Sequence, residues 1–237
     1  MATRFSVIPV LDLKGGRIVH ARAGDRAHYR PIRTPLAKTS SPADVLAGLL
    51  SLAPFRRLYI ADLDAIEGRA DNRKAITRLG RLHKTLEIWV DCGATSVEAA
   101  INTAGPAVVP VLGSESLPDG DTLAATRERL GDGGCVLSLD YRGGEFVGPV
   151  LLETEPALWP HNVIVMSLAR VGTDLGPDFP RLAAIKEKAG NRLVWAAGGV
   201  RGPQDLERLA AMGIAGALVA SAIHDGRLVP EVLAPLC

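Results

Sequence analysis

Short apolar runs alternate along the chain with segments in which apolar residues recur at helical spacing. The runs are continuous rather than alternating, which is typical of parallel strands buried on both faces. The eight predicted strands cover Ser6–Leu11, Arg57–Ala61, Ile88–Val90, Val108–Leu112, Val136–Leu139, Val163–Met166, Val194–Ala196 and Ala217–Val219. The six predicted helices cover Pro42–Leu52, Asn72–Leu82, Ser96–Ala104, Asp121–Leu130, Asp178–Ala189 and Pro203–Met212. Between Gly143 and His161 the helical pattern is weak, so a short helix or extended chain is expected there.

The chain also repeats itself at the scale of half its length. Residues 11–19 read LDLKGGRIV and residues 139–147 read LDYRGGEFV. Residues 88–96 correspond in the same way to residues 194–202, and residues 111–114 to residues 218–221. We interpret three matches in the same order as a duplication.

Eight strand–helix units with internal twofold symmetry predict an α/β fold, a closed (β/α)8 TIM barrel with a twofold half-barrel repeat. The single barrel is expected to span residues 1–237, with half-barrels at about 1–117 and 118–237. A doubly wound open sheet is the alternative, but its Gly-rich dinucleotide fingerprint is absent from the sequence.

The composition favours a single globular protein that binds neither nucleic acid nor a membrane. The 237 residues are 47% hydrophobic, enough for one large core, and a net charge of +1 gives no reason to expect nucleic acid or a membrane surface as partner. Three widely spaced cysteines form no CxxC motif and are expected to be reduced thiols. The longest apolar stretch, residues 212–223, is shorter than the roughly 20 residues that span a bilayer. We expect a soluble, cytoplasmic protein, whose oligomeric state the sequence leaves open.

Two aspartates end the repeated strands. Asp12 and Asp140 each precede a basic residue and a Gly-Gly pair. In a (β/α)8 barrel the active site lies at the carboxyl ends of the strands, and the first and fifth strands face one another. We therefore predict that Asp12 and Asp140 are catalytic and divide the roles of general acid and general base. The alternative is that each only accepts hydrogen bonds from the turn that follows it.

Small residues after the last two strands indicate a phosphate site, because they let backbone N–H groups approach an anion. The first half carries a related turn, but Asp91 stands where the second half has Ala197. A carboxylate beside an anion pocket disfavours phosphate and suits a cation or hydroxyl groups. The predicted phosphate-binding residues are Gly198, Gly199, Ala220 and Ser221, with Gly113 and Ser114 in the first half.

Two further groups of charged residues are candidates for ligand binding. Asp62, Asp64 and Asp91 lie near the ends of the second and third strands, where carboxylates suit a divalent cation. No histidine stands at ligand spacing and N-caps explain such residues equally well, so no metal is predicted. The loop from Arg22 to Lys38 gathers basic residues around Tyr29, and it either closes over an anionic substrate or is solvated.

Three segments, residues 8–16, 139–142 and 198–200, together with the half-barrel repeat, resemble the HisA/HisF barrels of histidine biosynthesis and a divergent HisA-related branch of them. The resemblance covers nearly the whole chain. It implies a small phosphorylated substrate, and either an Amadori rearrangement of a phosphoribosylamine or an imidazole-forming cyclisation, with no metal or organic cofactor. It also implies that one of Asp12 and Asp140 protonates the ribose ring oxygen while the other takes the C2′ proton.

This chain departs from the family pattern at two places. After the sixth strand the isomerases carry Thr-Asp and then Arg-Asp-Gly-Thr, whereas residues 166–173 read MSLARVGT, so Val171 replaces the second acid. Either Asp140 takes its role or the ordinary reaction is lost. The altered first-half turn predicts a substrate with a single phosphate, at Gly198, Gly199 and Ser221. The predicted substrate-binding residues are Lys14, Asp62, Asp91, Arg170, Gly172 and Thr173.

Several functions therefore stay open. The first is aldose–ketose isomerisation of a phosphorylated sugar or phosphoribosyl substrate. The resemblance of residues 19–32 to a branch found in methane- and methanol-metabolising microbes implies instead a role in making tetrahydromethanopterin or methanofuran. A Schiff-base aldolase would need Lys14, the one lysine near a strand end. A non-catalytic barrel that only binds a phosphorylated ligand is the remaining alternative.

Overall fold

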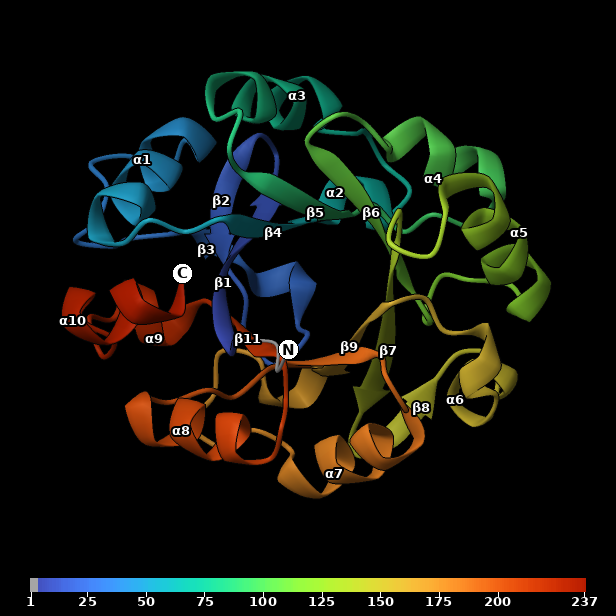
Figure 1. Cartoon of the computed structure of the whole chain (residues 1–237). Helices are drawn as coiled ribbons and strands as arrows, with labels where there is room; N and C mark the ends of the chain where they lie inside the picture. The colour runs from blue at the N-terminus through green and yellow to red at the C-terminus, as the bar shows by residue number, and fades with distance from the viewer. Residues whose placement is uncertain (1–3) are drawn as a thin grey trace.

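Eight parallel strands close into a barrel (Figure 1). The computed structural model describes residues 4–237. The first and last strands pair in parallel, with Ser6 opposite Gly216. This closure confirms the (β/α)8 TIM barrel and rules out the open doubly wound sheet. In order around the barrel the strands are β1 (Ser6–Lys14), β4 (Arg57–Asp62), β5 (Glu87–Asp91), β6 (Val108–Gly113), β7 (Val136–Arg142), β9 (Asn162–Ser167), β10 (Leu193–Ala197) and β11 (Gly216–Val219).

Helices form a ring outside the strands (Figure 1). The six predicted helices form within one residue of their expected ends, and between the fifth and sixth barrel strands only one short helix and a 3₁₀ turn occur, as expected from the weak pattern there. Side-chain caps explain several starts: Ser41 accepts from Asp44 N at 3.2 Å and Ser96 from Ala99 N at 3.2 Å. The helices are α1 (Pro42–Leu52), α2 (Leu63–Ile66), α3 (Arg73–Leu82), α4 (Val97–Thr103), α5 (Gly120–Leu130), α6 (Leu151–Thr154), α7 (Phe179–Lys188), α8 (Pro203–Ala211), α9 (Ser221–His224) and α10 (Pro230–Leu233).

Each half of the barrel extends its first strand into a hairpin. β1 turns at Gly15–Gly16 into the antiparallel β2 (Arg17–His20), which pairs with β3 (Arg30–Pro31). β7 turns at Gly143–Gly144 into the antiparallel β8 (Glu145–Val147). All four glycines have positive φ, which explains why the turns carry Gly-Gly. The expectation that Asp12 and Asp140 end their strands is therefore wrong by two residues, because the hairpins prolong both strands.

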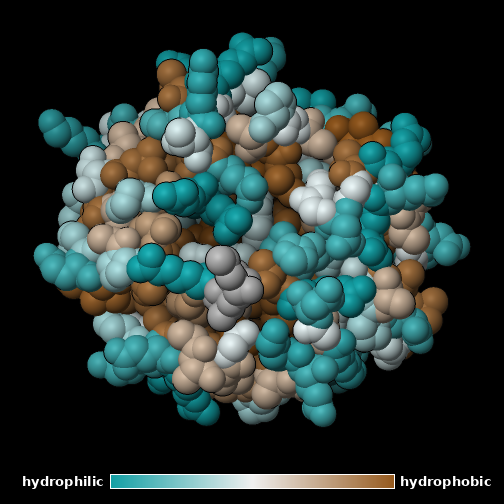
Figure 2. Space-filling view, in the orientation of Figure 1, coloured by the Kyte–Doolittle hydropathy of each residue, from teal (hydrophilic) through white to brown (hydrophobic). Residues whose placement is uncertain are grey.

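Apolar side chains fill the amino-terminal part of the barrel. Trp89 and Trp195 meet edge to face with ring centroids 5.2 Å apart, and both are buried. The guanidinium of Arg57, at the start of β4, lies 5.8 Å and 5.5 Å from their ring centroids. This packing leaves the open part of the interior at the carboxyl ends of the strands. Figure 2 shows hydrophilic residues projecting over much of the rim of the visible face.

Within residues 4–237, none of the helices has the length and apolar character needed to cross a bilayer.

Candidate active site

A cavity opens at the carboxyl ends of the barrel strands, where the active sites of (β/α)8 enzymes lie. It encloses about 990 Å³ when its open mouth is included. Residues from both halves of the chain reach it, so the fold brings together positions more than 200 residues apart. Of the predicted catalytic, phosphate-binding and substrate-binding residues, those lining it are Asp12, Asp91, Asp140, Gly172, Thr173, Gly198, Gly199, Ala220 and Ser221.

Asp140 lies on β7, is 4% exposed and is held by several donors. The Ser138 hydroxyl donates to Oδ1 at 2.7 Å, and the backbone N–H of Glu115 donates to Oδ2 at 3.1 Å. Burial raises the pKa of Asp140 to about 7, although the hydrogen bond from Ser138 acts in the opposite direction. Asp140 can therefore exchange a proton near neutral pH.

Asp12 lies on β1 and is less enclosed than Asp140. Burial raises its pKa to about 7, partly offset by the nearby Arg26 guanidinium. Within residues 4–237 no side chain or backbone donor stabilises its carboxylate, so the proton is retained to unusually high pH because of desolvation alone. Two carboxyl groups with perturbed pKa values on facing strands form the pattern that acid–base chemistry requires.

Asp91, at the end of β5, is a third carboxyl group in the cavity. Gly93 N–H donates to its Oδ1 at 3.0 Å, and the buried Tyr59 hydroxyl lies 3.3 Å from its Oδ2. Burial raises the pKa of Asp91 to about 6 and raises that of Tyr59 well above its usual value. Tyr59 therefore stays protonated and donates to Asp91.

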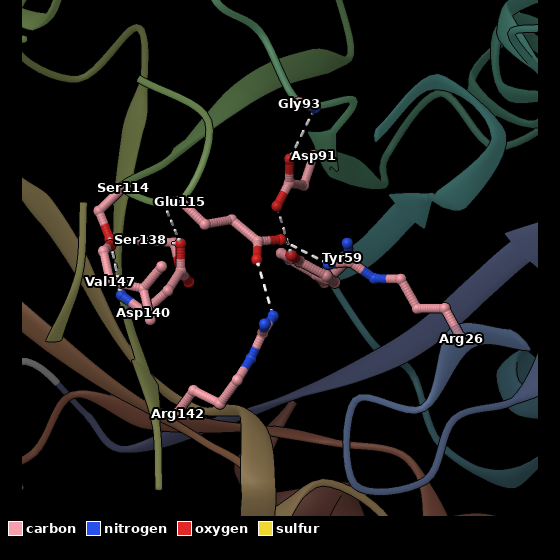
Figure 3. Close-up of polar contacts among 10 residues, drawn as sticks. All are labelled: Arg26, Tyr59, Asp91, Gly93, Ser114, Glu115, Ser138, Asp140, Arg142 and Val147. Atoms are coloured by element: carbon pink, nitrogen blue, oxygen red, sulfur yellow. Dashed lines mark hydrogen bonds and ion pairs between the residues drawn. The ribbon is translucent and has the colours of Figure 1, made fainter. Parts of the chain in front are cut away.

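An ion-pair network crosses the mouth of the cavity. Glu115, just after β6, pairs with Arg26 from the loop after β2 and, at 3.3 Å, with Arg142 at the end of β7. Figure 3 shows the Glu115 carboxylate lying between the two guanidinium groups, with Asp91 and Asp140 on either side. The loop from Arg22 to Lys38 thus sends a basic side chain to the catalytic end. The backbone of this loop is tied down by Lys14 Nζ, which donates to Arg26 O at 2.7 Å.

The backbone of the turn after β10 packs closely against neighbouring backbone atoms. Gly198 and Gly199 have φ values of +97° and +85°. A Cβ would lie 2.6 Å from Ser167 O at Gly198 and 2.3 Å from Gly176 O at Gly199, so neither position accepts a side chain. Within residues 4–237 no backbone or side-chain acceptor takes the N–H of Gly199. Together with Ala220 and Ser221 after β11, this turn lines the cavity with small residues.

The related turn after β6 is arranged differently. Ser114 is 1% exposed, its N–H donates to Ser138 O at 2.9 Å, and its hydroxyl donates to Val147 O at 2.7 Å. A Cβ at Gly113 would lie 3.2 Å from an Asp140 carboxylate oxygen and 3.5 Å from one of Asp91. Gly113 and Ser114 therefore face carboxylates or the protein interior, and we leave them out of the phosphate site proposed below.

Three predicted substrate-binding residues lie outside the cavity. Asp62 is 2% exposed and accepts from the N–H and the side-chain amide of Asn72, both at 2.7 Å. Arg170 donates to the backbone oxygens of Leu175 and Gly176 and so shapes the loop after β9. Lys14 pairs with Glu67 at 3.2 Å. These positions indicate structural roles, and Lys14 offers no free amine to the cavity for Schiff-base chemistry.

The carboxylates of the second and third strands do not form a metal centre. Asp64 accepts from Gly15 N at 2.6 Å and from the Asn72 amide at 2.9 Å. In the part of the chain that the structure describes, no three His, Cys, Asp or Glu residues are placed to hold a metal ion.

The wall of the cavity at Val171 is closed by two loops. Ala23 N donates to Val171 O at 2.8 Å, and a Cβ at Gly172 would lie 2.3 Å from Ala21 O. The loop after β9 is thereby sealed against the loop after β2, and Val171, Gly172 and Thr173 line the cavity. Val171 presents an apolar surface there.

Comparisons with known proteins agree with this geometry. The sequence family described as "Histidine biosynthesis protein" matches residues 6–229. The chain belongs to this family. An uncharacterized protein of Methanocaldococcus jannaschii is 30% identical over 225 residues, covering 94% of each chain. A Thermus thermophilus protein is 28% identical over 234 residues, covering 94% of this chain and 95% of its own. One from Deinococcus radiodurans is 30% identical over 234 residues, covering 94% of each.

The latter two relatives are named as imidazole-4-carboxamide isomerases, and their full name specifies two 5-phosphoribosyl groups. The resemblance stated from the sequence is therefore confirmed at the level of the family, and the family includes isomerases that act on phosphorylated small molecules.

Glu115 and Tyr59 were not predicted as site residues. The repeat does contain a signal for Glu115. If the match of residues 111–114 with residues 218–221 is continued by one position, Glu115 corresponds to Ala222, so the first half carries a charge that the second half lacks. Tyr59 lies within a continuous apolar strand, and its sequence context does not separate a core tyrosine from one in a cavity.

Proposed function

We propose that this protein is an acid–base isomerase that converts a phosphorylated aldose, or the corresponding phosphoribosylamine, into its ketose isomer, with Asp12 and Asp140 as the proton-transferring pair. The observation that carries the proposal is the placement of two carboxyl groups, each with a pKa raised to about 7, on facing strands of one cavity. Groups that titrate near neutral pH serve best as general acid and base.

The two environments assign the roles. Within residues 4–237 Asp12 lacks a donor that would stabilise its carboxylate, so we propose that its protonated form gives a proton to the ring oxygen as the C1–O bond breaks. Asp140 accepts from Ser138 and Glu115, which favour its ionised form, so it removes the C2 proton. Ring opening leaves C1 doubly bonded to its oxygen or nitrogen. The electron pair of the C2–H bond forms a C1=C2 double bond and the electrons of that C1 double bond return to the oxygen or nitrogen, which gives the enediol or enolamine. The C2 hydroxyl then loses its proton to form C2=O while a proton adds at C1, which gives the ketose or aminoketose. Substrate and product are isomers, so no further reactant is needed.

A single phosphate is proposed at the second-half end of the cavity. Gly198 and Gly199 place the backbone at the cavity wall, no acceptor among residues 4–237 takes the N–H of Gly199, and Ala220 and Ser221 add a second small-residue turn. Gly172 and Thr173 complete the wall beside it. The named relatives act on a substrate with two phosphoribosyl groups, whereas here carboxylates occupy the first-half end. We therefore propose a different, monophosphorylated substrate.

Turnover assays test this proposal. Wild type, Asp12→Asn and Asp140→Asn are assayed with the substrate of the named isomerases and with 5-phosphoribosylamine, and thermal shift is measured with phosphate and ribose 5-phosphate. Asp64→Asn is the matched control, because its carboxylate lies outside the cavity. Turnover lost in both active-site variants and kept in the control supports the proposal. Stabilisation by monophosphates without turnover of either compound would favour a non-catalytic barrel, or an intermediate of one-carbon cofactor synthesis as substrate.

A further inference from the structure

The two ends of the cavity carry opposite chemistry although they come from corresponding parts of the repeat. At the second-half end, Ala197 and Ala222 flank small-residue turns. At the first-half end, the corresponding positions are Asp91 and Glu115. At both positions the second half has an alanine and the first half has a carboxylate, so both differences add negative charge to the first-half end.

Backbone donors show the same contrast. In the first half the N–H of Gly93 is taken by Asp91 at 3.0 Å, and the N–H of Glu115 is taken by Asp140 at 3.1 Å. At the corresponding second-half turn, no acceptor within residues 4–237 takes the N–H of Gly199. The protein's own carboxylates thus hold the donors that an anionic ligand would need at the first-half end. A phosphate there would also meet two carboxylates at close range.

Two guanidinium groups already lie at the first-half end, because Arg142 pairs with one carboxylate oxygen of Glu115 at 3.3 Å and Arg26 pairs with the other. Arg26 extends from the loop after β2 and places its guanidinium on Glu115 (Figure 3). Its backbone is held separately by Lys14, so the side chain can leave while the loop stays in place. Asp91, by contrast, accepts hydrogen bonds within residues 4–237 only from the neutral donors Tyr59 and Gly93. Arg26 lies near enough to lower the pKa of Asp91 but makes no direct ion pair with it. A carboxylate without a direct ion pair in a largely enclosed site is suited to a charged hydrogen-bond donor.

We propose that Asp91 and Glu115 determine specificity by binding a protonated amino group of the substrate, at the end of the cavity opposite the phosphate turn. The substrate is then a phosphorylated amine, with its phosphate at Gly199 and its ammonium between Asp91 and Glu115. Arg26 occupies part of this position and gives it up when the ammonium binds. This inference rests on the proposed function, because it takes the phosphate position from it.

Binding of matched probe compounds tests the inference. Three series of increasing alkyl chain length are titrated by calorimetry: aminoalkyl phosphates, alkyl phosphates and alkane bisphosphates. At the best chain length the aminoalkyl phosphate is expected to bind about tenfold more tightly than the alkyl phosphate, and the bisphosphate more weakly than either. Equal or weaker binding of the aminoalkyl phosphate at every length would overturn the inference.

Two variants locate the effect. Asp91→Ala gives the first half the residue found in the second half, and it should abolish the preference for the amine and improve binding of the bisphosphate. Glu115→Gln should reduce the same preference while keeping the shape of the side chain. Glu128→Ala, an exposed residue on α5, is the charge-matched control and should change nothing. A preference that survives in both Asp91→Ala and Glu115→Gln would also overturn the inference.

Failure of the proposed phosphate site gives a different result. In that case Gly199→Ala would leave the affinity for every phosphate compound unchanged. If the phosphate site is real and the inference is wrong, Gly199→Ala weakens all three series while Asp91→Ala leaves their order as in wild type.

Discussion

Replacing Asp12 by asparagine should stabilise the folded protein at alkaline pH while removing its activity. The carboxyl group of Asp12 is largely removed from water, and within residues 4–237 no hydrogen-bond donor compensates for this, so burial raises its pKa from the usual 3.8 to about 7. Ionising it in the folded state is therefore unfavourable. Asparagine has nearly the same shape and carries no charge, so it removes this penalty.

The sign and size follow from proton linkage. A raised pKa means that the folded state holds the proton more tightly than the unfolded state. The penalty is absent below about pH 4, grows by about 1.4 kcal/mol per pH unit as pH rises, and is complete above about pH 7. The displacement of the pKa of Asp12 from 3.8 to about 7 corresponds to roughly 4 kcal/mol, an upper bound because the side chain is partly exposed.

Chemical denaturation at a series of pH values measures this effect. Asp12→Asn should match wild type near pH 4 and exceed its free energy of unfolding by about 2–4 kcal/mol at pH 8. Asp62→Asn is the control, because Asp62 is also shielded from water, at 2% exposed, but accepts two hydrogen bonds from Asn72, so its replacement should destabilise by about 1–3 kcal/mol. A destabilised Asp12→Asn at pH 8, or a gain that does not change with pH, would refute the reasoning.

Two other substitutions test separate parts of the site. Gly199→Ala should lower the free energy of unfolding by several kcal/mol because its Cβ would lie 2.3 Å from Gly176 O, and it should abolish thermal stabilisation by phosphate. Gly190→Ala is the control, because Gly190 has positive φ but open space around it. It should lose only about 1 kcal/mol and keep the stabilisation by phosphate. Ser138→Ala removes the donor 2.7 Å from Asp140 and should raise the pKa of that carboxyl further, by about one unit, as read from NMR titration of labelled aspartate. An unchanged phosphate effect in Gly199→Ala, or an unshifted titration in Ser138→Ala, would count against these assignments.

The fold was largely predictable because each sequence pattern that indicates it lies within a few neighbouring residues. Continuous apolar strands, cap residues such as Ser41 and Ser96, and the repeated Gly-Gly turns together specify a barrel of eight units. The position of the aspartates inside β1 and β7 was missed because strand ends were read from where the apolar run stops. In the structure the Gly-Gly turns carry the chain back into antiparallel pairing two residues later.

The site was predictable only in part, because contacts between distant segments decide it. The repeat directed attention to Asp12, Asp140 and the second-half glycines, and all of them line the cavity. The sequence did not show that Asp62 differs from the cavity carboxylates: its side chain accepts a hydrogen bond from Asn72 and does not line the cavity. The pairing of Arg26 with Glu115 joins residues 89 positions apart, and nothing in either local sequence indicates it.

The most direct test of the central claim is exchange of the C2 hydrogen of the substrate with solvent. Ribose 5-phosphate, with ammonia present to form the phosphoribosylamine, is incubated with enzyme in D₂O, and the C2 proton signal is followed by NMR. We expect that wild type incorporates deuterium at C2, that Asp140→Asn does not, and that Asp64→Asn behaves as wild type. An absence of exchange with wild type at saturating substrate, or equal exchange with Asp140→Asn, would contradict it.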